Sequence, residues 1–337
     1  MSIRLFKIVL LALCLAPGTW LRAPLQARYD VEIIIHSVSG SSEALENGWQ
    51  RLGIWEYRSK GLRFGGFSAL LALDDNRLRA FSDRGITWTF TEPDALSTSS
   101  RSRASDRMSG ELEPQSVAPG YEMDLWDIES ATVDPDTGQY WLGFEATHAI
   151  HRYSDASEAA GVRLLDGEVE WSLNSGAEAM VRLRDGRFVV IPEGGGEALL
   201  YPGDPVGGGS ASVIEYASPE RGFSVTEAVQ LPDGRLLQIL RDVVLDVPPF
   251  AARLALADLP MDGETEPIRP KVTLDIERLA PPENYEGLAY RERADGTLDV
   301  WMISDDNQSV MQRTLLVKLR FDPAKAAAFQ AKQKARE

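Results

Sequence analysis

The chain has 337 residues, 35 basic and 51 acidic side chains, a formal net charge of −16 and a single cysteine. Its length is sufficient for a large core, and an apolar fraction of 44% is typical of a globular chain rather than a disordered one. The acidity argues against nucleic acid and an anionic membrane surface as partners, because binding to either depends on clustered Lys and Arg. It fits a solubility device or a surface that collects cations.

The first segment, residues 1–27, has the organisation of a secretory signal peptide. Arg4 and Lys7 precede an apolar run of nine residues, and a small residue, Ala27, ends the segment at a tolerable cleavage site. The run is too short to span a membrane, although an uncleaved anchor is the alternative. We therefore expect a periplasmic or secreted protein with no stable membrane insertion after cleavage. Cys14 would leave with the segment, so the mature chain would have no disulfide and no thiolate.

A strand–turn–strand unit then recurs five times along the chain. Each copy opens with Ser or Glu, forms an apolar strand, turns at Asp and usually Gly, and continues through a second apolar strand to a polar or charged stop. The opening residues, spaced by 61, 49, 49 and 59 positions, are Ser68, Glu129, Glu178, Glu227 and Glu286. The Asp-Gly turns supply the positive φ of tight hairpins. A period of about 50 residues with this content is typical of propeller blades.

The sequence therefore predicts an all-β fold, a single β-propeller with five or six four-stranded blades. Val31–Ile35 and Gly53–Arg58 read as strands before the first copy, and the last copy runs out after Thr314–Phe321. A closed propeller leaves no sheet edge bare, so we expect an N-terminal strand, Gly53–Arg58, to complete the blade begun by Glu286. Five unrelated hairpins in a sandwich are the alternative, and the place of Val31–Ile35 in a sixth blade stays open.

Three parts follow from this organisation. They are a signal peptide at residues 1–27, the propeller domain at residues 28–322, and a C-terminal tail at residues 323–337, expected as a short helix or a frayed end. Residues 92–122 are rich in Ser, Arg, Pro and Glu and lack apolar periodicity. We interpret them as a long loop inside the domain.

Carboxylates recur at two positions of the repeat. The first strand of each blade lines the channel of a propeller, so the opening glutamates should converge, with the stops close to the same rim. Such crowding requires protonation, arginine partners or a cation, and oxygen-only ligands favour Ca²⁺. The residues expected to bind the metal are Glu129, Glu178, Glu227, Glu286, Asp83, Glu145, Glu193 and Asp305. A structural girdle, in which the glutamates cap amides or pair with arginines, is the alternative.

Six short motifs in this order resemble those of the bacterial phytase-like domain family, which is also described as having esterase-like activity of phytase type. They lie between about residues 50 and 322 and are Phe64-Gly65-Gly66-Phe67-Ser68, Ser82-Asp83-Arg84-Gly85, Trp126-Asp127-Ile128-Glu129, Gly176-Ala177-Glu178-Ala179, Asn284-Tyr285-Glu286-Gly287-Leu288 and Ser304-Asp305-Asp306-Asn307. The resemblance implies a secreted or periplasmic propeller with six blades. It also implies a distant similarity to the calcium-dependent propeller phytases.

Together these observations predict a Ca²⁺-assisted hydrolase of phosphate esters or related esters at the central channel. A small anionic ester would bind through the cation, a metal-activated water would attack phosphorus, and a carboxylate would act as the base. The candidate catalytic residues are Glu178, Glu286, Asp305, Arg84 and Arg241. Two alternatives stay open. One is a non-catalytic binding propeller with a structural cation, and the other is a calcium-dependent lactonase using amides of Asn174, Asn284 and Asn307.

Overall fold

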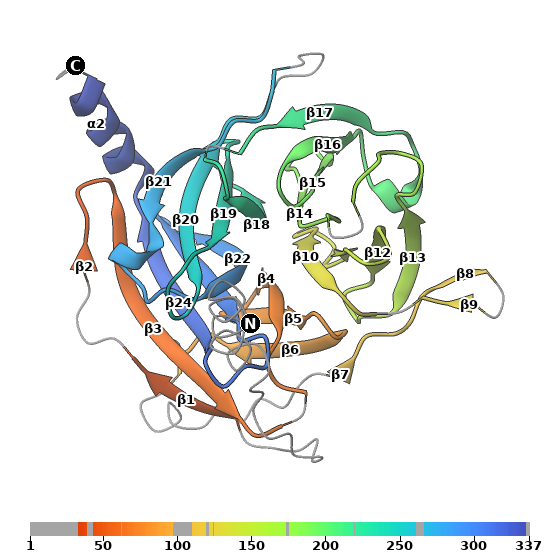
Figure 1. Ribbon diagram of the computed structural model, residues 1–337, viewed down its shortest axis with the longest axis horizontal. Coiled ribbons are helices and arrows are strands. Elements are labelled where there is room, and N and C mark those ends of the chain that lie inside the picture. The colour runs from red at the N-terminus through yellow and green to blue at the C-terminus, as the bar shows by residue number, and fades with distance from the viewer. Residues whose placement is uncertain are drawn as a thin grey trace, which may run out of the picture.

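The protein is described here from a computed structural model, which covers residues 33–38, 43–61, 63–96, 110–118, 121–123, 125–172, 175–218, 220–260 and 266–334. The segment expected as a signal peptide lies outside these residues. Strands dominate the described chain, and they form five antiparallel sheets arranged around one axis (Figure 1). Within these ranges, no helix is both long enough and apolar enough to cross a membrane.

Four of the sheets are built from consecutive strands. The first blade contains β4 (Phe67–Leu73), β5 (Arg77–Ser82), β6 (Ile86–Thr91) and β7 (Gly110–Glu111). The second contains β10 (Ile128–Val133), β11 (Tyr140–Phe144), β12 (Ala149–Tyr153) and β13 (Ala159–Leu164). The third contains β14 (Ala179–Arg182), β15 (Phe188–Ile191), β16 (Gly196–Tyr201) and β17 (Ser212–Tyr216). The fourth contains β18 (Ser224–Gln230), β19 (Leu236–Val243), β20 (Phe250–Ala257) and β21 (Lys271–Asp275).

The fifth sheet joins the two ends of the domain. Its order is β1 (Ile33–Ser37), β3 (Trp49–Ser59), β24 (Thr314–Phe321), β23 (Leu298–Asp305) and β22 (Asn284–Glu292), and β2 (Glu43–Ala44) also pairs with β3. The antiparallel register of β24 and β3 runs from Thr314 opposite Tyr57 to Phe321 opposite Trp49. The predicted closure by an N-terminal strand is therefore confirmed.

The blade count is five. Strand β1 pairs with the outer side of β3 and extends the fifth sheet instead of starting another one. The expectation of six blades, which came from the family resemblance, is wrong for this chain. The remaining elements are a small hairpin of β8 (Ser116–Ala118) and β9 (Tyr121–Glu122), two 3-10 turns at Pro205–Gly207 and Ile276–Arg278, and the helix α2 (Pro323–Lys334) in the predicted tail.

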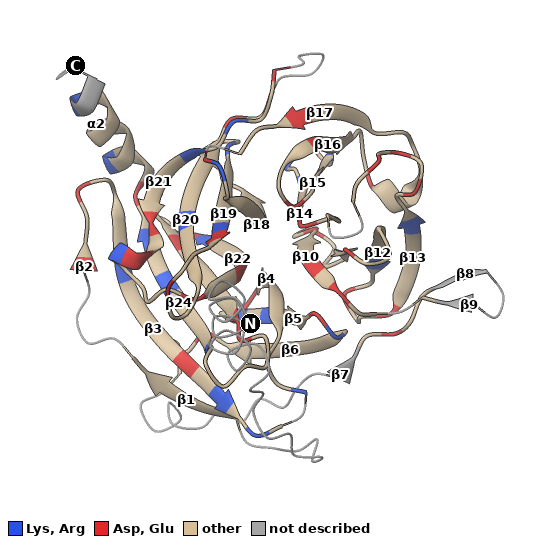
Figure 2. Cartoon of the chain, in the orientation of Figure 1, with Lys and Arg blue, Asp and Glu red and all other residues tan. Residues whose placement is uncertain are grey.

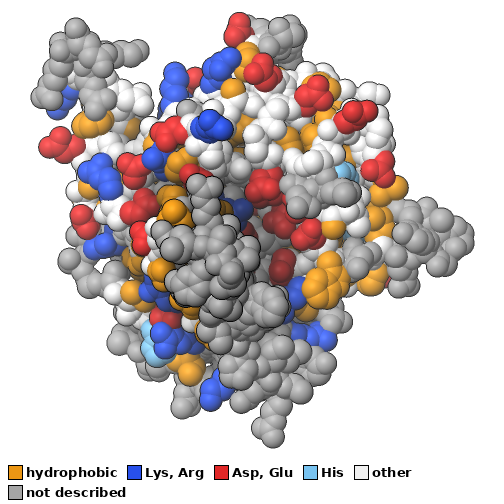
Figure 3. Space-filling view, in the orientation of Figure 1, with side chains coloured by type: hydrophobic (Ala, Val, Ile, Leu, Met, Phe, Trp, Pro, Cys, Tyr) orange, Lys and Arg blue, Asp and Glu red, His pale blue; other side chains and the backbone are white. Residues whose placement is uncertain are grey.

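The apolar core lies between neighbouring blades, because each sheet is covered on both faces. All eight residues of β23 are buried. One cluster joins the fourth and fifth blades around Trp49, Leu254 and Leu288, and another joins the fifth and first blades around Trp88 and Trp301. The inner strands β4, β10, β14, β18 and β22 surround the axis (Figure 1). Acidic side chains also gather around the centre of the face in view (Figures 2 and 3).

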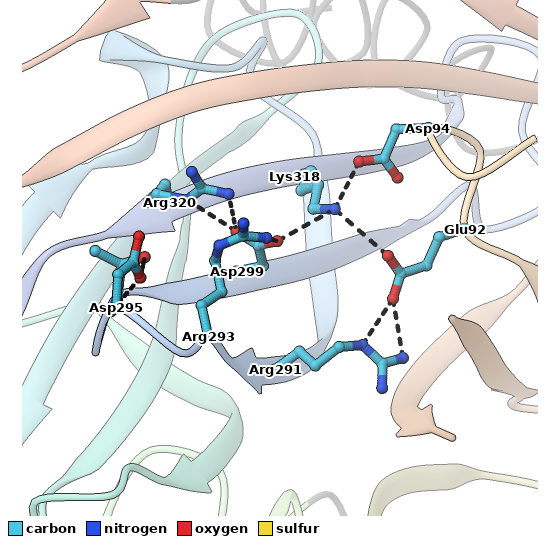
Figure 4. Close-up of polar contacts among 9 residues, drawn as sticks. Glu92, Asp94, Arg291, Arg293, Asp295, Asp299, Lys318 and Arg320 are labelled. Atoms are coloured by element: carbon cyan, nitrogen blue, oxygen red, sulfur yellow. Dashed lines mark hydrogen bonds and ion pairs between the residues drawn. The ribbon is translucent and has the colours of Figure 1, made fainter. Parts of the chain in front are cut away.

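A buried ion-pair network strengthens the junction between the fifth and first blades (Figure 4). Lys318 of β24 is 5% exposed, and its Nζ lies 2.6 Å from Asp94 Oδ2 and 3.4 Å from both Glu92 Oε2 and Asp299 Oδ2. Arg320 donates from Nε and Nη2 to Asp299 Oδ1, at 2.9 and 2.7 Å. The lysine therefore links β24 to the segment that follows β6.

Candidate metal centre

The inner strands carry a shared irregularity at one end of the channel, which we call the mouth. Strand pairing skips one residue in four blades, as in a β-bulge, and Glu178 directly precedes β14 at the matching place of the third blade. These five positions, the bulge positions, are held by Ser68, Glu129, Glu178, Thr226 and Glu286. A bulge leaves its residue outside the ladder, so its side chain is free to aim at the mouth.

The fourth blade differs by one residue from the alignment that the sequence indicated. Thr226, not Glu227, holds the bulge position, and its Oγ1 donates to the carbonyl of Tyr285 at 3.1 Å. Glu227 lies one step further along the channel and is fully buried. Its two carboxylate oxygens accept the backbone N–H groups of Ala131 and Ala228, at 3.3 and 3.0 Å. Glu227 is thus bound to the inner wall, while Glu129, Glu178 and Glu286 remain at the mouth.

A second set of five equivalent residues, the stop positions, lies at or just beyond the ends of the neighbouring strands. It consists of Asp83, Glu145, Glu193, Arg241 and Asp305. The backbone N–H of Asp83 donates to Gly66, and Arg241 and Asp305 lie opposite residues just before the bulges of their blades. Four blades therefore bring an acid to this position, and the fourth blade brings an arginine.

Three carboxylates of the second blade converge. Asp127, Glu129 and Glu145 each offer one oxygen, and these oxygens lie within 4.8 Å of one another. Asp127 has a φ of +72°, and its backbone N–H donates to Asp83 O at 2.5 Å. The N–H of Ala146 donates to its Oδ2 at 3.1 Å. Sequence reasoning did not select Asp127 as a ligand. The available signal was its place two residues before Glu129.

Burial and crowding shift the acids at the mouth toward their protonated forms. Burial raises the pKa of Glu129 well above its usual range, and the nearby charges of Glu178 and Glu286 raise it further. Burial, followed by the charge of Asp127, raises the pKa of Glu145 to about 7. Burial, followed by the charge of Glu193, raises the pKa of Glu178 well above its usual range.

Glu178 is a buried acid, 5% exposed, and the positive charge of Arg241 acts on it. Glu129 on the second blade is less compensated, because the charges that act most on it are all negative. Desolvation of a carboxylate without compensation is costly. A cation at the mouth would supply positive charge beside Glu129, and this donor set fits one.

Arg241 places a positive charge among the acids on the opposite side of the mouth. Its Nη1 donates to Asn284 Oδ1 at 2.5 Å and also to Glu286 Oε1, and its Nη2 lies 3.6 Å from Glu193 Oε1. Asn284 Nδ2 donates to the same Glu286 oxygen at 2.8 Å. Asp305, 6% exposed, accepts the backbone N–H of Asn307 at 2.7 Å. The structure thus brings Glu178, Glu286 and Arg241 into one electrostatic group.

Arg84 stands beside the first blade. Its Nε donates to Asp83 Oδ1 at 3.2 Å, and its Nη2 donates to Gly65 O at 3.1 Å. Gly66 has a φ of +69°, and a Cβ at this position would come within 2.4 Å of Asp83 Oδ1. A glycine is therefore needed for the turn and for the close approach of this carboxylate.

The chemistry of the mouth is that of a hard cation site. Oxygen ligands alone, mostly carboxylates, suit Ca²⁺, which takes about six to eight oxygens and tolerates irregular geometry. Asp127, Glu129 and Glu145 each offer one such oxygen, so these three would supply only part of the coordination of Ca²⁺. Of the amides expected in a lactonase arrangement, Asn284 is bound to Arg241 and Glu286, Asn307 donates to Gln312 at 2.8 Å, and Asn174 lies outside the described residues.

Comparisons with known proteins place this arrangement in a family. A family model described as "Phytase-like: Esterase-like activity of phytase" matches residues 62–308. No curated protein matches the chain. Solved structures similar to the chain include regucalcin, a calcium-binding protein from Agrobacterium tumefaciens (15% identity, TM-score 0.41, covering 82% of this chain and 88% of that one). They also include an exo-1,5-α-L-arabinanase from a bovine ruminal metagenomic library (10% identity, TM-score 0.46, covering 77% and 94%). Since the family model spans most of the propeller, the chain belongs to the phytase-like family.

Proposed function

We propose that the protein is a Ca²⁺-dependent hydrolase of phosphate esters or related esters, acting at the mouth of the propeller. The observation that carries this proposal is the convergence of Asp127, Glu129 and Glu145, whose oxygens lie within 4.8 Å of one another, beside the buried carboxylate of Glu178. Membership of a family described by an esterase-like activity of phytase supports the reaction class.

Asp127, Glu129 and Glu145 would hold the ion. When bound, Ca²⁺ supplies a Lewis acid that attracts an anionic ester and acidifies water. Glu178 is buried on the adjacent blade, and its raised pKa suits it to accept a proton from an attacking water. Arg241 and Arg84 place guanidinium groups at the rim, where they would orient the anionic part of a substrate and stabilise charge that develops on it.

The partner that this chemistry implies is a small anionic ester. Eight carboxylates stand around the mouth against two guanidinium groups: Asp83, Asp127, Glu129, Glu145, Glu178, Glu193, Glu286 and Asp305 against Arg84 and Arg241. Without a cation this excess would repel an anion. We infer a periplasmic or secreted location from the signal-like segment at residues 1–27, together with a Ca²⁺-rich setting for the site.

Purified, chelator-treated protein should be assayed with and without Ca²⁺ against phosphomonoesters, phosphodiesters and lactones. We expect Ca²⁺-dependent turnover of a phosphate ester and a Ca²⁺-dependent rise in melting temperature. Glu145→Gln should lose both, whereas Glu178→Gln should lose turnover and keep the rise. Glu197→Gln, an exposed position of the third blade, is the matched control.

Three outcomes would count against the proposal in different ways. A Ca²⁺-dependent melting temperature without turnover of any ester would favour a binding propeller with a structural cation. Turnover of lactones alone would favour the lactonase. Full phosphatase activity in Glu145→Gln would show that the chemistry takes place elsewhere.

A further inference from the structure

The stop positions of the five blades are equivalent, yet their charges are not. Asp83, Glu145, Glu193 and Asp305 are acidic, and only the fourth blade carries a base, Arg241. The side chain of Arg241 is 16% exposed, so it is held in the mouth and not extended into solvent. A single inward arginine among four equivalent acids has an electrostatic consequence for cation binding.

The guanidinium of Arg241 reaches the two blades that flank its own. It donates to Glu286 of the fifth blade, and its Nη2 lies 3.6 Å from Glu193 of the third. Its positive charge therefore sits between acids of different blades, as a bound cation would. The pKa of Arg241 is raised by the charges of Glu286, Glu178 and Glu193, which outweigh the effect of burial.

Asp127, Glu129 and Glu145 converge on the other side of the mouth, and no ion pair described for this chain joins them to a base. Arg84, on the first blade, donates to Asp83 and to Gly65 O. Arg241 thus makes direct contacts with acids of the third and fifth blades, whereas only its longer-range charge reaches Glu129 and Glu145.

We propose that Arg241 is a built-in counter-ion that occupies the place of a second cation and limits the mouth to one divalent ion, held by Asp127, Glu129 and Glu145. This inference rests on the proposed metal site. A second ion beside Glu193 and Glu286 would meet the fixed positive charge of Arg241 at close range, and like charges repel strongly in a partly buried site. If the guanidinium is removed, Glu178, Glu193 and Glu286 are left without a counter-charge.

The test is the number of Ca²⁺ ions bound per chain, measured by equilibrium dialysis and calorimetric titration of the full-length protein. We expect one ion for the wild type and two for Arg241→Gln, with the second lost again when Glu178→Gln is added. Arg241→Lys, which keeps the charge, should bind one ion. If Arg241→Gln still binds one Ca²⁺ ion per chain, the inference is overturned. Arg241 would then only link neighbouring blades through its hydrogen bonds.

A second measurement keeps the arginine in place, in case Arg241→Gln does not fold. Glu193→Gln should change the Ca²⁺ dissociation constant of the wild-type site by less than about threefold, whereas Glu145→Gln should weaken it at least a hundredfold, because only Glu145 is a ligand. Loss of Ca²⁺ binding in Glu193→Gln would place the ion beside Arg241 and overturn the inference. Absence of Ca²⁺ binding in the wild type would instead refute the proposed function, so the two failures are distinguishable.

Discussion

A buried histidine away from the mouth predicts how the stability of the propeller depends on pH. His151 in β12 is fully buried, and neither ring nitrogen has a hydrogen-bond partner. Its ring centroid lies 4.1 Å from that of Phe144 and 6.4 Å from that of Tyr153. Burial in this aromatic surrounding lowers the pKa of His151 from 6.5 to about 4, because the site does not solvate an imidazolium ion.

The magnitude follows from linkage. An unfolded chain binds the proton below pH 6.5, whereas the folded chain binds it only below about pH 4. The unfolded state therefore gains protons first as the pH falls, and the free energy of unfolding decreases through this window. Taking these two pKa values, the loss between pH 7 and pH 5 is about 2 kcal/mol, and it approaches about 3 kcal/mol below pH 4.

The assay is urea denaturation at pH 7, 6 and 5 of the wild type and of His151→Phe. The acids at the mouth titrate in both proteins, so the difference between them isolates the histidine. We expect His151→Phe to lose about 2 kcal/mol less than the wild type between pH 7 and pH 5, whatever its stability at pH 7. His36→Gln, an exposed position in β1, should show the wild-type dependence. Equal pH dependence in the wild type and His151→Phe would refute the reasoning.

Three further variants test the fold by urea denaturation at pH 7. Lys318→Met should lose about 3–5 kcal/mol of unfolding free energy, because it removes the buried cation that pairs with the buried carboxylates of Glu92 and Asp299. The exposed Lys325→Met is its control, with a change within about 0.5 kcal/mol. Trp49→Ala should lose about 3–5 kcal/mol, since this fully buried ring stacks on Phe321 at 4.4 Å across the closure. Gly143→Ala should lose about 1–3 kcal/mol, because its Cβ would lie 2.3 Å from Ser130 Oγ. A change below about 0.5 kcal/mol in Lys318→Met, Trp49→Ala or Gly143→Ala would contradict the contacts described for that residue.

The fold was largely predictable because its signals are local and repeated. The Asp-Gly turns at Gly186, Gly234 and Gly296 all have positive φ, as the hairpin pattern requires. The fourth strand of the first blade was missed, since Gly110–Glu111 is only two residues long and lies in a segment without apolar periodicity. The number of blades could not be predicted from the sequence either. The sequence of an outer strand such as β1 does not differ from that of a strand that begins a new blade.

The candidate site was predictable in composition but not in register. Spacing alone placed Glu227 with the other opening glutamates, yet the bulge at Thr226 moves it by one residue, and such a step turns a side chain to a different surface. Asp127 enters the site through a left-handed backbone conformation, which the sequence pattern does not reveal. The link from Arg241 to Glu286 joins two blades and depends on the closed ring.

The pairing of β3 with β24 has a consequence for the order in which the protein is made. Strand β3 leaves the ribosome before all four of the blades that separate it from its main partner, β24, in the sequence. During that interval the edge of β3 is open to the wrong neighbours, including other chains. Contacts between residues so distant in sequence form slowly, which prolongs the exposure. Once β24 arrives, β3 is paired on both sides, so separation of the two ends of the ring requires the pairing of β3 with β24 to open.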